Sequence, residues 1–552
     1  MPEGFTLNNQ QINAIERLRA FLKNKHEKMI VLEGYAGTGK STIISHLLQS
    51  PEYQKLNICM SATTNKAVSV LKEMGKVENK KIDYLTIHKL MKIKRTIDSD
   101  GKQQFITSFH ETTDSRNKKC KSIFSYNVIV IDEASMINKY LFHDLEIISR
   151  RIVGKIIFVG DRNQLPPVNQ LLSDVFAPNK YDIISLTQVM RSSGDNNIVN
   201  ISNYIRESIS NKDNLRLKTF KDDNVQIHRA EKKWLDSYVS DLINSKGHLK
   251  SIILAYTNAR CAKINYDVRK QLFSGEDTKK KYLPGEHIVF NNYYQNSKNK
   301  YYTSQTAIVR DVSFGKIKVK NLNLMDLINF KNKLEPFNNP LELVAPGIDN
   351  PCPICKTEEI DYDVVTVCEH KLCLECAKLW LNKHKCCPLC RIEVDTDVFT
   401  IKEYPVLSHL LNRFAVFVNQ LEFEVYGIKL VNGDTVYTLT EQSKQQYKVI
   451  EFKLKEIMAK IKQEVLRSKK IINLGLLLLS RMWLYIFNNI IDLFAEVGYG
   501  YCITSHKSQG STYNNVYVDV SNILNYNRDE IDGLKCLYTA VTRTADNLHI
   551  FY

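Results

Sequence analysis

The sequence predicts an α/β protein with two regions of parallel β-sheet, a small β domain and a cysteine-rich insertion. Apolar runs typical of buried strands alternate with helix-like segments over residues 25–210, and similar runs return at 251–258 and between 498 and 520. Eight of the 13 cysteines lie between Cys352 and Cys390. Strands that alternate with helices favour parallel sheets covered on both faces, and 552 residues are enough for three or four domains.

The chain carries a formal net charge of +16, which favours a polyanionic partner such as nucleic acid, although a basic, well-solvated surface would give the same charge. The clustered cysteines indicate metal binding in a reducing, intracellular compartment rather than a disulfide framework. The first residues lack the pattern of a secretory signal. The most apolar stretch, 472–480, ends at Arg481 after too few residues to span a bilayer, so we expect a buried helix and no membrane partner.

A nucleotide-binding loop is the clearest motif in the chain. Residues 34–41 read GYAGTGKS and fit the pattern G-x-x-x-x-G-K-[ST], with a strand-like run before them and a helix-like segment after them. In this motif, backbone amides and the helix N-terminus hold the phosphates. Lys40 is expected to reach the β- and γ-phosphates and Ser41 to bind Mg²⁺, so the sequence predicts ATP and Mg²⁺ as cofactors.

An acidic pair follows the strand-like run in VIVIDEAS. We expect Asp132 to hold Mg²⁺ through water and Glu133 to orient the attacking water, as any NTP hydrolase requires. Gln164, in GDRNQLPPV, is a candidate sensor of the γ-phosphate. Arg191 and Arg543 are candidates for stabilising the charge of the transition state, because phosphoryl transfer benefits from arginines there.

The complete set of motifs resembles that of superfamily-1 helicases, in particular the Dda and RecD-like branch of superfamily 1B. In chain order the matching segments are LNNQQINAI, EGYAGTGKST, SATTNKA, LTIHKLM, VIDEAS, GDRNQLPPV, LTQVMRS, TSHKSQGST and LYTAVTRT. The resemblance covers nearly everything except about residues 345–397. It implies two RecA-like P-loop domains with ATP in their cleft, a small SH3-like β domain, and 5′-to-3′ travel on single-stranded DNA.

The resemblance also assigns site residues, with Gln11 placed at the adenine. The residues implied for nucleotide binding are Gln11, Gly34, Gly37, Thr38, Gly39, Lys40, Ser41, Thr42, Gln509 and Gly510. The residues implied for DNA contact are Thr63, Asn65, Thr86, His88, Phe105, Thr504 and His506. Taken singly, either histidine is more typical of a packed, hydrogen-bonded core residue.

A hairpin that splits the duplex, the pin of the Dda-like family, is expected at about 92–121. Asp100-Gly101 is a tight-turn signal between two polar strand-like runs. Phe105 would either stack on a base or pack beneath the hairpin. The tyrosines at 282, 293, 294, 301 and 302 are expected to belong to the SH3-like domain, where a structural role that braces the pin is favoured over DNA binding.

The cysteine-rich segment has the spacing of a zinc module. Cysteines with two residues between them can share a tetrahedral Zn²⁺. Three such pairs and the pair Cys368-x-His370 make two sites, with Cys386 and His384 as spare candidates for the last pair. The order of ligands resembles a RING finger, which implies that pairs one and three share one zinc and pairs two and four the other. The first site is then Cys352, Cys355, Cys373 and Cys376, and the second is Cys368, His370, Cys387 and Cys390.

Ligase RING fingers have further features that this segment matches. Ile354, Trp380 and Pro388 would form a shallow pocket for a ubiquitin-conjugating enzyme, and Arg391 would touch both that enzyme and its ubiquitin. The alternative is that zinc only folds an insertion too small for its own core. The sequence therefore leaves open whether the RING finger acts as a ubiquitin ligase or as a structural or protein-binding module.

These inferences give one function and a domain plan. We expect an ATP-dependent 5′-to-3′ DNA helicase or translocase that acts on single-stranded and fork DNA, in DNA replication or repair, in the nucleus or at a viral replication site of a eukaryotic cell. The alternatives are a nucleic-acid-stimulated ATPase whose RING finger lacks ligase activity, and RNA as the substrate. The expected segments are 1–210 (first RecA-like domain), 211–282 (start of the second), 283–345 (SH3-like domain), 346–397 (RING finger), 398–450 (remainder of the β domain) and 451–552 (remainder of the second RecA-like domain). Within 398–450, a hairpin turn is expected at Asn432-Gly433.

Overall fold

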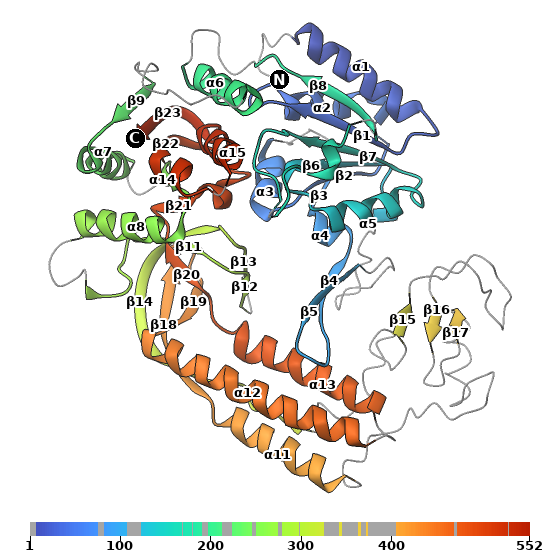
Figure 1. Cartoon of the computed structure of the whole chain (residues 1–552), viewed down its shortest axis with the longest axis vertical. Helices are drawn as coiled ribbons and strands as arrows, with labels where there is room; N and C mark the ends of the chain where they lie inside the picture. The colour runs from blue at the N-terminus through green and yellow to red at the C-terminus, as the bar shows by residue number, and fades with distance from the viewer. Residues whose placement is uncertain are drawn as a thin grey trace.

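The structure is a computed structural model of the chain. It describes residues 7–53, 55–74, 82–107, 123–167, 169–178, 180–189, 197–211, 224–245, 250–273, 279–296, 299–324, 342–344, 363–365, 371–373, 404–468, 472–527 and 529–552. Two α/β domains lie side by side, a β domain follows the second of them, and three long helices cross the far end of the molecule (Figure 1).

The first α/β domain is built on a six-stranded parallel sheet, which confirms the predicted fold class for this region. The strand order is β3-β2-β6-β7-β1-β8. The strands are β1 (Met29–Gly34), β2 (Ile58–Ala62), β3 (Ile82–Thr86), β6 (Val128–Asp132), β7 (Lys155–Gly160) and β8 (Asp182–Leu186). The helices are α1 (Asn9–Lys23), α2 (Lys40–Gln49), α3 (Asn65–Met74), α4 (Ile87–Leu90) and α5 (Lys139–Ser149), with short 3₁₀ turns at Pro51–Tyr53, Ile123–Ser125, Ala134–Met136 and Asp174–Phe176. The next helix, α6 (Asn197–Asn211), buries Ile198, Ile201 and Ile205 in the core of the second α/β domain.

Both faces of this sheet are buried, because successive side chains of a strand point to opposite faces. On β1, Ile30 and Leu32 belong to one apolar core, and Met29 and Val31 belong to the other. The strands are therefore apolar throughout, as parallel strands covered on both faces usually are.

The second α/β domain has a five-stranded parallel sheet in the order β21-β10-β22-β23-β9. Its strands are β9 (Val225–His228), β10 (Ser251–Ala255), β21 (Cys502–Thr504), β22 (Tyr513–Asp519) and β23 (Thr544–Phe551). Its helices are α7 (Glu231–Asn244), α8 (Asn258–Leu272), α14 (Val520–Asn525) and α15 (Glu530–Val541), with a 3₁₀ turn at Ser505–Ser508. Because β21, β22 and β23 come from the last part of the chain, the sheet is completed only after the long insertion between α8 and β21.

The insertion begins with an antiparallel β domain in the order β19-β18-β14-β11-β20. Its strands are β11 (His287–Phe290), β14 (Thr306–Lys318), β18 (Glu422–Leu430), β19 (Thr435–Leu439) and β20 (Val497–Tyr499), and a small hairpin joins β12 (Tyr294–Gln295) to β13 (Lys300–Tyr301). The predicted turn at Asn432-Gly433 lies between β18 and β19, and Gly433 has the positive φ of +85° that favours glycine.

A helical tower was not predicted. It consists of α11 (Pro405–Asn419), α12 (Glu441–Arg467) and α13 (Ile472–Ile486), followed by a π-helical turn at Phe487–Ile491. The assignment of 398–450 to the β domain is therefore wrong at α11 and at the start of α12. The assignment of 451–552 to the second RecA-like domain is wrong up to Tyr499, because the tower and β20 of the β domain lie there. The signal was present in α11, where Leu407, Leu411, Phe414 and Val418 recur at helical spacing and are all buried.

A β-hairpin leaves the first domain after α4 and runs to the tower (Figure 1). Its strands are β4 (Ile93–Ile97) and β5 (Gln103–Thr107), which pair antiparallel, and Gly101 between them has a φ of +76°. This hairpin lies within the 92–121 range expected for the pin. Within 346–397, the structure describes only β16 (Asp363–Val365) and β17 (Lys371–Cys373), which form a small antiparallel sheet with β15 (Glu342–Val344).

Among the residues that the structure describes, no helix combines the length and the apolar character needed to cross a bilayer. The apolar stretch at 472–480 is part of α13, as predicted, and Leu478 and Leu479 are buried in the tower.

Candidate active site and nucleic-acid interface

The phosphate-binding loop connects β1 to α2. Gly37 and Gly39 have φ values of +81° and +82°, so the turn requires glycine at both positions. A Cβ on Gly39 would lie 2.6 Å from the Nε2 atom of Gln11. The Lys40 ammonium donates to the carbonyl oxygens of Gly34 at 2.6 Å and Tyr35 at 2.8 Å. Lys40 is thus held against the backbone of the loop, and burial lowers its pKa against the opposing influence of Asp161 and other acids.

The Gln11 side chain supports the phosphate-binding loop. Its amide nitrogen donates to the carbonyl oxygen of Thr38 at 3.1 Å, and its amide oxygen accepts from the Asn8 N–H at 3.1 Å. Both ends of the fully buried amide are therefore bonded to protein, whereas the resemblance places Gln11 at the adenine. Sequence reasoning missed the adjacent Gln10, whose amide oxygen accepts from the N–H groups of Thr187 and Gln188, both at 3.1 Å.

The acidic pair lies at the carboxyl end of β6, beside the loop. Burial and the neighbouring Glu133 raise the pKa of Asp132 to about 6, while its Oδ1 accepts from the Glu133 N–H at 2.8 Å. Glu133 has a φ of +53°, an uncommon value for a residue other than glycine. This conformation lets two consecutive carboxylates lie at the same edge of the sheet, where one can hold a cation while the other reaches a water.

The second domain contributes an arginine to this site. The Arg543 guanidinium is buried and lies 3.8 Å from the Glu133 carboxylate. It also donates to the carbonyl oxygens of Thr539 at 3.1 Å and Ser511 at 3.4 Å, which fix its direction. The other predicted arginine, Arg191, lies outside the described residues.

Tyr538 makes a further bridge between the domains. Its hydroxyl donates to the buried Asp161 carboxylate at 2.7 Å and accepts from the backbone N–H of Ala36, in the phosphate-binding loop, at 3.4 Å. Sequence reasoning did not select Tyr538 or Asp161, although both lie inside segments that carry the helicase resemblance.

The segment that contains Gln164 is held from the second domain on both sides. The Leu165 N–H donates to the Thr539 hydroxyl at 3.1 Å, and the Gln509 amide donates to the Leu165 carbonyl oxygen at 3.2 Å. Gln509, expected at the nucleotide, is thus bonded to protein, and Gly510 beside it has a φ of +72°. The Gln164 amide oxygen is buried and has no hydrogen-bond partner within the described part of the chain, as a group intended for a ligand would.

These side chains fit ATP and Mg²⁺. Thr38 lies in the loop, and Ser41 and Thr42 lie in the first turn of α2, where backbone N–H groups and the helix dipole favour phosphate. Lys40, Asp132 and Arg543 carry the charges that a triphosphate and its cation require. Bound ATP would supply the phosphoanhydride bond whose hydrolysis these residues are arranged to promote.

The residues predicted to contact DNA follow the carboxyl ends of strands in both α/β domains. Thr63 and Asn65 come after β2, Thr86 and His88 come at the end of β3, and Thr504 and His506 come at the end of β21. The carboxyl ends of parallel strands meet at one edge of each sheet, so each group lies at that edge of its own domain, as the predicted DNA track requires.

The two histidines are open to this track, whereas the threonines are more enclosed. His88 and His506 are exposed, and the surrounding protein lowers the pKa of both imidazoles. The Thr86 side chain is buried and accepts from the Lys89 N–H at 3.4 Å, which caps α4, and Thr504 is buried too. The two histidines are therefore better placed for contact with a strand than either threonine.

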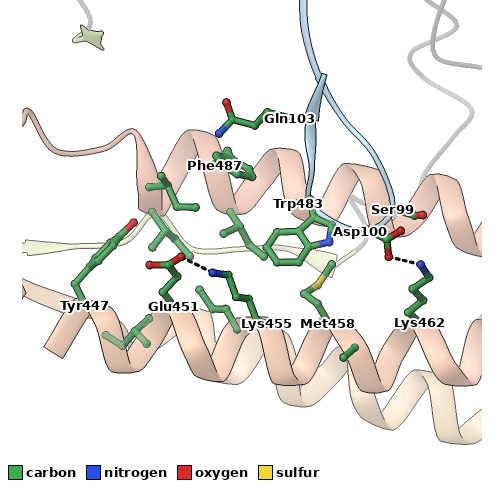
Figure 2. A pocket seen from close by; sticks show the side chains of 17 residues that line it. Ser99, Asp100, Gln103, Tyr447, Glu451, Lys455, Met458, Lys462, Trp483 and Phe487 are labelled. Carbon is green, nitrogen blue, oxygen red and sulfur yellow. Dashed lines mark hydrogen bonds and ion pairs between the residues drawn. The ribbon is translucent and has the colours of Figure 1, made fainter. Parts of the chain in front are cut away.

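The tip of the pin is packed onto the tower (Figure 2). The Asp100 carboxylate forms an ion pair with Lys462 of α12, and a Cβ on Gly101 would lie 2.7 Å from the Trp483 ring of α13. Beside this contact is a cavity of about 560 Å³, lined mainly by apolar side chains of the two helices. The Phe105 backbone pairs with Arg95 in the hairpin, but the Phe105 side chain lies outside what the structure describes.

The predicted zinc ligands also lie outside the described residues, apart from the backbone of Cys373 at the end of β17. The same holds for Ile354, Trp380, Pro388 and Arg391. Among the described side chains, no group of three or more His, Cys, Asp or Glu residues is arranged to hold a metal ion. The four cysteines whose side chains are described, at 59, 261, 502 and 536, are buried and free.

Comparison with known proteins agrees with this division of the chain. Residues 6–231 match the AAA domain family, residues 499–551 match the UvrD-like helicase C-terminal domain, and residues 352–390 match the C3HC4-type zinc finger, or RING finger.

Relatives of three kinds were found. An uncharacterized protein, R530, of Acanthamoeba polyphaga mimivirus is 26% identical over an alignment of 568 residues that covers 98% of each chain. The ATP-dependent RecD2 DNA helicase of Deinococcus radiodurans is 27% identical over 194 residues, 35% of this chain and 23% of that one. The E3 ubiquitin-protein ligase RNFT1 of Xenopus tropicalis is 52% identical over 50 residues, 9% of this chain and 12% of that one.

Solved structures of Pif1 helicases overlap with most of the chain. One, described for DNA unwinding at forked double-stranded DNA, is matched over 99% of this chain and 92% of its own, with a TM-score of 0.42 and 14% identity. The Bacteroides Pif1 helicase in complex with ADP-AlF3 and single-stranded DNA is matched over the same shares, with a TM-score of 0.41 and 13% identity.

The AAA domain match covers the phosphate-binding loop and the first α/β domain, and the UvrD-like helicase C-terminal match covers the last strands of the second. Together with the RING finger match, they confirm the resemblance of the motifs to a RecD-like superfamily-1B helicase with an inserted RING finger.

Proposed function

We propose that the chain is an ATP- and Mg²⁺-dependent DNA helicase that moves 5′ to 3′ on single-stranded DNA and opens the duplex at a fork. The observation that carries this proposal is the reach of Arg543 and Tyr538 from the second domain into the phosphate-binding loop and acidic pair of the first. A site completed across two domains couples hydrolysis to their relative movement. The 5′-to-3′ direction rests on the family resemblance alone.

Each residue has a distinct part in the proposed cycle. Lys40 would leave the carbonyl oxygens of Gly34 and Tyr35 for the phosphates, while Glu133 orients the attacking water and Arg543 stabilises the developing charge. Gln164 would report the γ-phosphate to Leu165, whose backbone is held by the second domain. Closing and reopening of the cleft would then shift the His88 part of the track relative to the His506 part.

The pin supplies the strand-separating element of this proposal. Because its tip rests on the tower rather than in solvent, it presents a fixed edge to the duplex. Phe105 and the predicted DNA contacts Thr63 and Asn65 would then position the single strand along which the motor moves.

Substitutions at the nucleotide site test the assignment of ATP and Mg²⁺ as cofactors. Lys40→Ala should abolish hydrolysis, because it removes the charge that holds the phosphates, and Glu133→Gln should retain nucleotide binding but lose at least about 100-fold in turnover, in line with losses of a positioned acid-base group. Hydrolysis should rise with single-stranded DNA more than with RNA of the same sequence. A greater stimulation by RNA would make RNA the substrate.

We infer that the RING finger holds two Zn²⁺ ions through the eight predicted ligands and acts as a ubiquitin ligase. The RING family match and the identity to a region of RNFT1, a ligase, support this assignment. Trp380→Ala and Arg391→Ala should each reduce autoubiquitination with a matched ubiquitin-conjugating enzyme at least tenfold. Ubiquitin chains of unchanged yield would favour the alternative, a RING finger that is structural or only binds proteins.

The relative from a giant virus supports a particular setting for these activities. A ligase requires the ubiquitin of a eukaryotic cell, and thiolate ligands require a reducing compartment. We therefore propose that the protein acts on replicating or repaired DNA at a viral replication site or in the nucleus of a eukaryotic cell.

A further inference from the structure

Two tyrosines of the small β12–β13 hairpin face away from the core of the SH3-like domain. In the antiparallel register, Tyr294 is opposite Tyr301, so the next pair outward is Tyr293 and Tyr302. Tyr294 and Tyr301 are buried, and the Tyr301 ring stacks on Phe290 at 4.4 Å. Because side chains alternate along a strand, the outer pair turns to the opposite side, where Tyr293 is 43% exposed.

The outer pair forms a small aromatic surface, with ring centroids 5.7 Å apart and an interplanar angle of 48°. Its geometry is fixed by hydrogen bonds. The Tyr302 N–H donates to the Gln305 side chain at 3.0 Å, and its carbonyl oxygen accepts from the Gln305 N–H at 2.9 Å. The Tyr293 hydroxyl donates to Gln295 at 2.7 Å. A ligand would therefore meet rings that are already ordered, which lowers the entropic cost of binding.

This surface lies between the two parts of the predicted DNA track. On one side, the Lys89 ammonium of the first domain, next to His88, lies 3.5 Å from the Tyr302 hydroxyl and 5.8 Å from the ring centroid. On the other side, the Lys507 ammonium of the second domain, next to His506, donates at 2.8 Å to Asn291, just before the hairpin. Figure 1 shows the hairpin projecting from the SH3-like sheet on the side of α4.

We propose that Tyr293 and Tyr302 form a stacking platform for a nucleobase of the single strand as it passes from one RecA-like domain to the other. Aromatic rings flanked by cations suit single-stranded nucleic acid, because rings stack on bases while ammonium groups hold phosphates. Tyr282, Tyr294 and Tyr301 keep the structural role expected for them. The proposal rests on the proposed function, since it requires a strand in the track.

The alternative for Tyr302 is a brace that holds the SH3-like domain against the first domain through Lys89. Stacking requires the nucleobase of the bound strand, whereas a brace between domains acts whether or not the strand has bases. We would measure the affinity of the full-length protein for a fluorescein-labelled oligothymidylate and for an oligonucleotide of the same length that consists of abasic sites. The variants are Tyr293→Leu and Tyr302→Leu, with Tyr293→Phe and Tyr302→Phe as conservative forms. Tyr526→Leu, a change of an exposed tyrosine at the end of α14, is the matched control.

For a stacking platform, each Leu variant should bind oligothymidylate about 5- to 150-fold more weakly than the wild type, the range of one base stacked on an aromatic ring. The Phe variants should bind normally, and all variants should bind the abasic oligonucleotide like the wild type. An equal loss of affinity for both oligonucleotides would show that the tyrosine is a brace instead. Unchanged affinity for both would show that the tyrosines do not contact the strand. Failure of the wild type to bind any oligonucleotide would contradict the proposed function itself.

Discussion

Tyr538 shows how much of the coupling between domains depends on single polar atoms. Its hydroxyl touches both the buried Asp161 carboxylate and the backbone of the phosphate-binding loop. Arg543, five residues further along the chain, approaches Glu133 from the same domain. Because these contacts join the two α/β domains beside the phosphate-binding loop, they would couple a nucleotide bound there to a strand held by both domains.

Tyr538→Phe should slow hydrolysis stimulated by single-stranded DNA. The substitution leaves the buried Asp161 carboxylate without this donor, a change worth about 1–3 kcal/mol, or roughly 5- to 150-fold in turnover if the contact forms in the transition state. Steady-state hydrolysis at saturating DNA measures it. The control is Tyr517→Phe, which removes a comparable bond to Asp241 within the second domain. Equal turnover of the Tyr538 variant and the wild type would exclude a role for the bridge.

Acid should destabilise the second domain through His549. Its ring is stacked on Tyr517 at 4.0 Å, and burial lowers its pKa to about 4, from an ordinary value near 6.5. The unfolded chain therefore binds a proton first, so stability should fall as the pH drops from about 6.5 to about 4, by on the order of 3 kcal/mol for this group.

Urea unfolding of wild type and His549→Phe across that pH range would isolate this contribution. The variant should lose less stability on acidification, because phenylalanine keeps the stacking without a titrating group. An identical pH dependence of both proteins would show that other groups cause the acid sensitivity.

Elements formed by a few consecutive residues could be predicted from the sequence, whereas contacts between distant elements could not. The loop at Gly34–Ser41 and the hairpin turn at Asp100-Gly101 are short patterns whose chemistry lies within a few residues. The tower was missed because the turn signal at Asn432-Gly433 led to the assignment of all the flanking residues to the β domain. The apolar residues of α11 nevertheless recur with a clear helical period. Gln10 and Tyr538 were missed because their partners are more than 100 residues away, a distance that no local pattern reports.

Lifting the pin from the tower should uncouple hydrolysis from strand separation. Gly101→Ala places a methyl group 2.7 Å from the Trp483 ring at a positive φ, so the hairpin tip must move. Fork unwinding should fall several-fold while hydrolysis stimulated by single-stranded DNA stays near the wild-type rate.

The matched control for this test is Gly433→Ala. It has the same backbone strain, about 1–2 kcal/mol, at a φ of +85°, but nothing lies within 4 Å of the added group. Equal unwinding by both glycine variants would mean that the contact with Trp483 has no role in strand separation.

As a whole, the molecule places its RING segment inside an insertion of the second RecA-like domain, outside the strands that build either motor sheet. The motor sheets are complete without residues 346–397. A moving helicase would thereby carry a second activity to proteins that it meets on DNA.

The two activities should therefore separate genetically. Cys352→Ser with Cys368→Ser removes one ligand from each predicted zinc site, and it should abolish ubiquitin transfer while unwinding stays within about twofold of the wild type. Bound zinc, measured by atomic absorption, should fall in parallel with transfer. Loss of unwinding in a variant whose motor domains remain folded would show that the RING finger serves the motor.

The proposed motor opens DNA in one direction at the expense of ATP. Strand separation should be measured on partial duplexes with a 5′ or a 3′ single-stranded tail, with and without ATP, for the wild type and Lys40→Ala. We expect unwinding from the 5′ tail only, dependent on ATP and absent in Lys40→Ala. Hydrolysis of ATP without separation from either tail, or separation from the 3′ tail alone, would contradict it.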